Sequence, residues 1–102
     1  MYLPDLERIR TLNNGKIVLV RRGMIYFFIY DIRPEYHLIA VLKTIETAKL
    51  VFEKVLREKN FVSCLYLARV HSDEMGMLGD PMVLSSYSKE ENVVKTYKTI
   101  YM

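Results

Sequence analysis

The most constraining feature of the sequence is an uninterrupted apolar run at residues 24–30, Met-Ile-Tyr-Phe-Phe-Ile-Tyr. The run is too short for a membrane-spanning helix, which needs about 20 apolar residues, and its β-branched and aromatic residues favour a strand. Because side chains alternate between the faces of a strand, one face would carry Ile25, Phe27 and Ile29, and the other Tyr26, Phe28 and Tyr30. A strand that is apolar on both faces is either central and covered on both sides or presents aromatic side chains to a partner.

The length and composition of the chain fit one compact domain, residues 1–102. A hydrophobic fraction of 51% supports a packed core and argues against disorder. No segment is long and apolar enough to cross a bilayer, and Asp5 and Glu7 interrupt any N-terminal leader. We therefore expect a cytoplasmic protein with no membrane partner. The lone cysteine, Cys64, cannot form an internal disulfide, and its apolar surroundings predict a buried thiol.

Hydrophobic periodicity and turn residues divide the chain into strands and helices. Strands are expected at residues 16–22, 24–31, 36–42, 61–70 and 82–87. The clearest helix covers residues 44–59, because apolar residues recur there at helical spacing and Thr44 can cap its start. We also expect a short N-terminal helix at residues 3–12, and a last helix after Ser88, which opens a Ser-x-x-Glu capping box. Gly23, between the first two strands, indicates a tight hairpin turn.

The order strand, turn, strand, helix occurs twice, at residues 24–60 and again at 61–102. The expected helices begin at a hydroxyl residue in both units, Thr44 in the first and Ser88 in the second. Two degenerate β-β-α motifs would pair about a pseudo-two-fold axis, giving one antiparallel sheet with helices on one face and a groove where the units meet. The alternative is that any two β-β-α units look alike at this level. Either way the expected fold class is α+β.

The sequence contains no recognisable catalytic constellation. Cys64 has no flanking histidine, no serine lies in a nucleophile elbow, and the glycines form neither a dinucleotide-binding motif nor a P-loop. A metal site would use His71 with Asp73, Glu74 and Asp80, but their spacing matches no metal-binding loop, and acidic surface loops are common. We therefore predict a protein with no catalytic residues, no cofactor and no metal.

Nucleic-acid binding is one alternative function. The net charge is +3, and basic residues crowd the first third of the chain, at Arg8, Arg10, Lys16, Arg21, Arg22 and Arg33. Tyr26, Phe28 and Tyr30 could form a sheet face on which unpaired bases stack, beside Arg21 and Arg22. The competing interpretation is that these aromatic side chains lie in the core and the arginines are solvated.

The leading hypothesis is a non-enzymatic interaction module that binds a protein or peptide. An antiparallel sheet with an uncovered edge can accept an extended peptide as an added strand, and exposed tyrosines, of which this chain has up to 8, are enriched at interfaces. The binding residues would be Tyr26, Phe28 and Tyr30, in a groove or at a sheet edge. The loop at residues 73–78 is a second candidate surface, unless its methionines pack back on the core. The sequence allows a monomer or a homodimer.

Tyrosine-rich strands such as residues 24–30, the absence of glutamine, and Lys- and Glu-rich helices such as residues 52–59 give the chain a distinctive style. In this style the whole chain resembles the small orphan proteins of filamentous viruses that infect hyperthermophilic archaea, such as the Acidianus filamentous viruses. The resemblance implies an archaeal viral protein made in the cytoplasm of the host cell. It carries over no functional residue, because that group shares no motif.

The interaction hypothesis makes a prediction about the apolar run. If its aromatic side chains meet a partner, replacing Tyr26 or Tyr30 by Ala should weaken partner binding without unfolding the protein. If either change collapses the fold, the strand belongs to the core. Partner binding and thermal unfolding of the two variants distinguish these outcomes.

Overall fold

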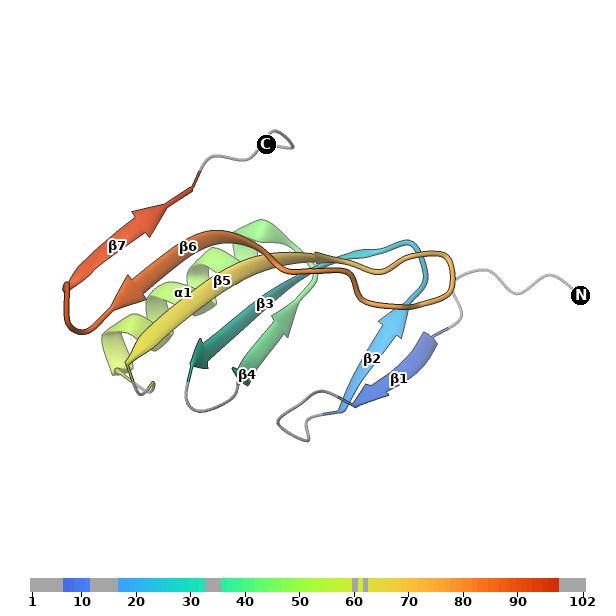
Figure 1. Ribbon diagram of the computed structural model, residues 1–102, viewed down its shortest axis with the longest axis horizontal. Coiled ribbons are helices and arrows are strands. Elements are labelled where there is room, and N and C mark those ends of the chain that lie inside the picture. The colour runs from blue at the N-terminus through green and yellow to red at the C-terminus, as the bar shows by residue number, and fades with distance from the viewer. Residues whose placement is uncertain (1–6, 12–16, 33–35, 60, 62, 98–102) are drawn as a thin grey trace, which may run out of the picture.

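Figure 1 shows the computed structural model of the protein, which describes residues 7–11, 17–32, 36–59, 61 and 63–97. Its elements are β1 (Glu7–Thr11), β2 (Ile17–Arg21), β3 (Ile25–Ile32), β4 (Tyr36–Leu42), α1 (Ile45–Glu58), β5 (Cys64–His71), β6 (Met82–Ser88) and β7 (Val93–Thr96). β1 and β2 form a sheet of their own. The other strands form a five-stranded sheet in the order β4-β3-β5-β6-β7, in which every neighbouring pair is antiparallel. The α+β class is therefore confirmed.

β3 is an inner strand whose two faces are both buried. It pairs with β4 on one side and β5 on the other. Ile29 is fully buried on the face that α1 covers, in a cluster with Phe52 of the helix and Leu65 of β5. On the opposite face Tyr26 is only 2% exposed. Of the two placements that the apolar run allowed, the structure adopts the covered, inner one.

The aromatic face of β3 forms a second core cluster on the side of the sheet away from α1. Its buried members are Tyr26, Phe28, Tyr30, Leu38, Ala68 and Val70. The rings of Tyr30 and Tyr66 stack with centroids 5.4 Å apart and an interplanar angle of 15°. The hydroxyl of Tyr26 accepts a hydrogen bond from the backbone N–H of Arg21 at 2.7 Å, which ties the end of β2 to the five-stranded sheet.

The helix α1 forms where its periodicity predicts it. The Thr44 hydroxyl accepts a hydrogen bond from the Thr47 backbone N–H (3.2 Å) and caps the N-terminus. Lys59 ends the helix in the left-handed conformation, and its N–H bonds to the Val55 carbonyl. The buried stripe is Ala48, Phe52 and Val55. Burying Phe52 alone contributes about 1.5–3 kcal/mol, so packing on the sheet, rather than helix propensity, holds α1 in place.

The connection from β4 through α1 to β5 crosses over β3. Both β4 and β5 are antiparallel to β3, so they run parallel to each other with β3 between them. Parallel strands cannot be joined by a tight turn and need a crossover, usually a helix. The helix therefore lies across one face of the sheet, against β3, β4 and β5 (Figure 1).

The predicted N-terminal helix at residues 3–12 is wrong over Glu7–Thr11, which forms strand β1. β1 pairs antiparallel with β2, with Ile9 opposite Leu19. So short a segment cannot sustain an isolated helix, whereas a partner strand satisfies its backbone hydrogen-bonding groups. Residues 3–6 and 12 of the prediction lie outside the described residues.

The predicted hairpin turn at Gly23 is a turn, but it does not join paired strands. β2 pairs with β1, and β3 belongs to the other sheet. Gly23 has a φ of +67°, in the left-handed region. Its N–H donates to the Asp73 carbonyl (3.0 Å), and the Ser72 N–H donates to the Met24 carbonyl (2.8 Å). The loop after β5, rather than a β2–β3 ladder, holds this turn.

The predicted last helix is wrong over Val93–Thr96, which forms strand β7. The Ser-x-x-Glu sequence from Ser88 lies in the turn between β6 and β7 rather than capping a helix, and the Asn92 N–H bonds back to the Ser88 carbonyl (2.7 Å). Val93, Val94 and Thr96 are β-branched, which favours a strand once a partner strand is available. Residues 98–102 of the prediction lie outside the described residues.

The pseudo-two-fold β-β-α repeat is not confirmed. Residues 24–60 contain β3, β4 and α1, but the described part of residues 61–102 contains β5, β6 and β7 and no helix. The sheet is antiparallel as expected, with one helix on one face among the described residues. The described residues therefore give no support to the expected groove between two such units.

Because Tyr26 and Tyr30 are core residues, replacing either by Ala should lower the free energy of unfolding by about 3–5 kcal/mol. Tyr26→Phe removes the hydroxyl that accepts from the Arg21 N–H and should cost about 1–3 kcal/mol. Urea denaturation followed by circular dichroism measures both. Leu50→Ala, at a position 67% exposed on α1, is the control and should change stability by no more than about 0.5 kcal/mol. Unchanged stability in both tyrosine-to-alanine variants would show that this face is not core.

Candidate functional site

The outer edge of β7 is the most open part of the sheet. β7 ends the strand order, and all four of its residues are exposed. Val93 is 53% exposed and Val94 is 47% exposed, and they point to opposite faces of the sheet. The other edge, β4, is better covered, since Leu38 is buried and α1 packs against the strand. An exposed strand edge with large apolar side chains is unusual, because it is a template for pairing with another chain.

The turn that leads into β7 is fixed by hydrogen bonds to β6 and to the segment just before β5. Asn92 adopts a left-handed φ of +57°, and the Tyr87 hydroxyl donates to its side-chain oxygen (2.5 Å). The Lys89 N–H donates to the Ser63 carbonyl (2.8 Å), and its ammonium group donates to the Phe61 carbonyl (2.6 Å). The turn is therefore anchored to the start of β5, which fixes the direction in which β7 leaves it.

The pairing of β6 with β7 decides which backbone groups point outward. The Tyr97 N–H donates to the Leu84 carbonyl at 2.9 Å, so this pair is hydrogen-bonded. Bonded and non-bonded pairs alternate along an antiparallel ladder, and Thr96 lies opposite Ser85, with Val94 opposite Tyr87. The N–H and C=O groups of Val94 and Thr96 therefore point away from β6, toward the outer edge.

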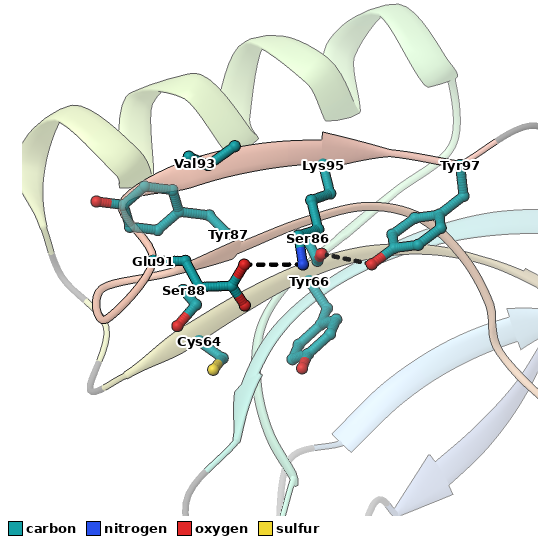
Figure 2. A pocket seen from close by; sticks show the side chains of 9 residues that line it. All are labelled: Cys64, Tyr66, Ser86, Tyr87, Ser88, Glu91, Val93, Lys95 and Tyr97. Carbon is teal, nitrogen blue, oxygen red and sulfur yellow. Dashed lines mark hydrogen bonds and ion pairs between the residues drawn. The ribbon is translucent and has the colours of Figure 1, made fainter.

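A small pocket lies beside this edge, where side chains of β5, β6, β7 and the preceding turn meet (Figure 2). Its lining consists of Cys64, Tyr66, Ser86, Tyr87, Ser88, Glu91, Val93, Lys95 and Tyr97. Its volume is about 160 Å³. Pockets for drug-sized ligands are larger, roughly 300–1,000 Å³. The space suits one amino-acid side chain rather than a cofactor.

Hydroxyl groups and one ion pair make this pocket polar. The hydroxyls of Ser86 and Tyr97 are hydrogen-bonded at 3.0 Å. The Lys95 ammonium lies 2.8 Å from a carboxylate oxygen of Glu91, and both side chains are about half exposed. The hydrogen bond to Glu91, and then its negative charge, raise the pKa of Lys95 above the usual lysine value. Lys95 therefore keeps its positive charge in the middle of the exposed edge.

The binding residues predicted from the sequence lie elsewhere. Tyr26, Phe28 and Tyr30 are buried in the aromatic core cluster around β3 and offer no face on which a base or a partner could stack. Arg21 ends β2 and Arg22 lies in the following turn, and both are half-buried. The structure brings Arg21 and Tyr26 together, but through a hydrogen bond that links two sheets.

The residues of the β7 edge were placed by the sequence in a helix. Val93, Val94 and Tyr97 fall at helical spacing, but the same residues also fit a turn followed by a strand. Asn92 tolerates a left-handed turn conformation, and the β-branched residues after it favour a strand. A turn residue followed by such a run could have indicated a hairpin.

The other candidate residues form no chemical centre in the described part of the chain. There, no three His, Cys, Asp or Glu side chains lie close enough together to hold a metal ion. The Asp73 carboxylate accepts from the Met75 and Met77 backbone N–H groups, at 2.8 and 2.9 Å, so it shapes its own loop. Cys64 is half-buried rather than buried, and it lines the pocket. No helix in the described residues has the length and apolar character that crossing a membrane requires.

The sequence allowed the loop at residues 73–78 either to form an interaction surface or to pack back on the core, and the structure shows some of each. Met75 and Met77 are 65% and 58% exposed, whereas Leu78 packs against the aromatic core cluster. The exposed methionines are a second apolar surface. Their loop lies at the far end of the β5–β6 hairpin from β7 (Figure 1). They present side chains but no strand edge.

Comparisons with protein-family models, with curated proteins and with solved structures give no significant match. The resemblance to archaeal viral proteins therefore stays a prediction. The functional argument depends on the geometry of the β7 edge and its pocket.

The turn before β7 can be tested at Asn92. Asn92→Ala and Asn92→Gly both remove the acceptor of the Tyr87 hydroxyl, but only alanine is strained at positive φ, by about 1–2 kcal/mol. We expect Asn92→Ala to be less stable than Asn92→Gly by about that amount. Amide hydrogen exchange at Tyr97, whose N–H bonds to β6, should be faster in the alanine variant. Equal exchange in the two variants would contradict the left-handed turn.

Proposed function

We propose that this protein is an interaction module that binds an extended segment of a partner protein at the outer edge of β7. The segment would add to the sheet as a further antiparallel strand, and one of its side chains would enter the adjacent pocket. The observation that carries the proposal is that all four residues of β7 are exposed at the end of the sheet, with two residues whose backbone groups point outward.

Strand addition uses the features found at this edge. Main-chain hydrogen bonds supply affinity, and side-chain pockets supply specificity. The outward N–H and C=O groups of Val94 and Thr96 provide two donors and two acceptors. On the pocket face, Val93 and Tyr97 lie on either side of Lys95 (Figure 2). β-Branched and aromatic residues form favourable cross-strand pairs.

The expected affinity is weak. Each backbone hydrogen bond contributes about 0.5–1.5 kcal/mol net, and each cross-strand side-chain pair about 0.2–1 kcal/mol. Association and ordering of the peptide oppose these terms. We therefore expect a dissociation constant in the range of roughly 10 μM to 1 mM, which is typical of transient recognition of a flexible segment.

The alternative function is nucleic-acid binding. The aromatic side chains of β3, on which bases were expected to stack, are buried. It still predicts tight binding of single-stranded RNA that weakens steeply as salt is added. Binding of that kind, lost in an Arg21→Gln, Arg22→Gln double variant, would favour the alternative over strand addition.

The test uses a neutral peptide, Asn-Val-Val-Gln-Thr-Tyr, which copies residues 92–97 with glutamine at the position of Lys95. Titration into isotopically labelled protein should shift the amide signals of Val94 and Thr96 more than those of β4. Thr96→Pro removes an outward N–H without removing a β6 hydrogen bond, a position where an edge strand tolerates proline. This variant should stay folded and lose peptide binding, measured by fluorescence anisotropy.

Thr96→Ala is the matched control, because it shortens the same side chain and keeps the N–H. It should bind the peptide within about twofold of the unmodified protein. If Thr96→Pro binds as well as Thr96→Ala, or if the peptide shifts no β7 amide, strand addition at β7 is wrong.

A further inference from the structure

We propose that the segment bound by β7 carries an acidic residue opposite Lys95, with apolar residues two positions away on either side. The partner is thus an acidic, alternating strand of another protein rather than a second copy of this chain. The inference rests on the proposed function, because it names the chemistry of the strand that this edge accepts.

Lys95 occupies the central position of the exposed edge. Its backbone groups turn toward Ser86 of β6, so a residue opposite it in an added antiparallel strand falls in a non-hydrogen-bonded pair. In such pairs the Cβ atoms lie closest, about 4.5–5.5 Å apart. The residue facing Lys95 is therefore the position of the partner where charge matters most.

The ion pair with Glu91 shows that the Lys95 ammonium group can bind a carboxylate at this edge. Its carboxylate lies 2.8 Å from the ammonium nitrogen, and the side chains are 54% and 51% exposed for Glu91 and Lys95. An exposed surface pair is weakly held and exchanges readily with other partners. A carboxylate on an added strand can take the place of Glu91 at the same ammonium group, and Glu91 then returns to solvent.

A second copy of β7 fits this edge everywhere except at its centre. Pairing two copies so that Val94 lies opposite Thr96 would satisfy the outward backbone groups of both strands and bring Val93 against Tyr97. The same register sets Lys95 directly opposite the Lys95 of the second copy. Like charges directly opposite are destabilising, and lysine in an edge strand is a recognised guard against self-pairing. The positive charge of Lys95 therefore disfavours pairing with a second copy of β7 and favours a partner strand with an acidic residue at this position.

The neighbours of Lys95 on the same face define the flanking positions. Val93 is 53% exposed and Tyr97 is 45% exposed. Residues of an added strand two positions from the acidic one would face these side chains. Apolar residues there would cover Val93 and the Tyr97 ring, whose hydroxyl is held by Ser86. The pattern expected of the partner is apolar-x-acidic-x-apolar.

The experiment compares three peptides that differ only at their central residue. They copy residues 92–97 with Glu, Gln or unmodified Lys at the position of Lys95. Fluorescence anisotropy at low ionic strength should rank the affinities Glu, then Gln, then Lys, with about two- to fivefold between successive peptides. Raising the salt concentration should shrink these ratios, because exposed charges are screened.

Two variants then exchange the charges. Lys95→Glu should reverse the order, so that the Lys peptide binds better than the Glu peptide. Glu91→Gln removes the internal competitor and should tighten binding of the Glu peptide by about two- to fivefold while leaving the Gln peptide unchanged. Glu90→Gln is the matched control, because it removes the same charge at a neighbouring exposed turn residue. It should change the Glu peptide less than Glu91→Gln does.

The outcomes separate this inference from the proposed function. If none of the three peptides binds or shifts the amides of Val94 and Thr96, strand addition itself is wrong. If all three bind equally and Lys95→Glu changes nothing, the function stands and the acidic partner is overturned. If the Lys peptide binds best to the unmodified protein, or the protein dimerises through β7, the edge accepts a second copy and the inference is wrong.

Discussion

The structure depends on burying both faces of β3. Phe27 and Ile29 pack toward α1, and Tyr26, Phe28 and Tyr30 pack on the other side of the sheet. A strand of this kind needs a partner on each edge and a cover over each face. β4 and β5 meet the first need, and the crossover through α1 meets the second on one face because it must pass over β3 to connect two parallel strands. The position of the helix thus follows from the position of β3.

Because α1 is placed over β3, the β7 end of the sheet is thinly covered. α1 packs against β3, β4 and β5, while β7 extends the sheet beyond it (Figure 1). The residues of β7 are exposed on both faces, and they contribute little to the core. A strand that adds little to stability and is nevertheless fixed by an anchored turn is available for binding. β7 is short and carries a lysine, two features by which natural sheets limit pairing between copies at an open edge.

The tyrosines illustrate why residue type alone does not locate an interface. Tyr26 and Tyr30 lie in the core, where the Tyr26 hydroxyl finds a backbone donor, whereas Tyr97 lies at the exposed edge and helps to line the pocket. Tyrosine suits both places because it combines a large apolar ring with one polar group. Which tyrosine lies at an exposed edge is decided by the strand order, and an alternating pattern contains no information on strand order.

The sequence by itself determined the α+β class, the strand at residues 24–31 and the helix from Thr44, because these depend on local patterns: a two-sided apolar run, and a capped stripe several turns long. It left open whether that strand is an inner one or presents its aromatic side chains to a partner. It could not determine the ends of the sheet. Glu7–Thr11 and Val93–Thr96 are short segments whose apolar spacing fits a helix as well as a strand, and the choice was made by hydrogen-bonding partners, β2 for the first and β6 for the second. The candidate site was missed for the same reason. Lys95 and Tyr97 become neighbours on a sheet edge only when β7 pairs with β6. The tertiary structure alone decides that no other described strand pairs with this edge, while the aromatic face of β3 is covered.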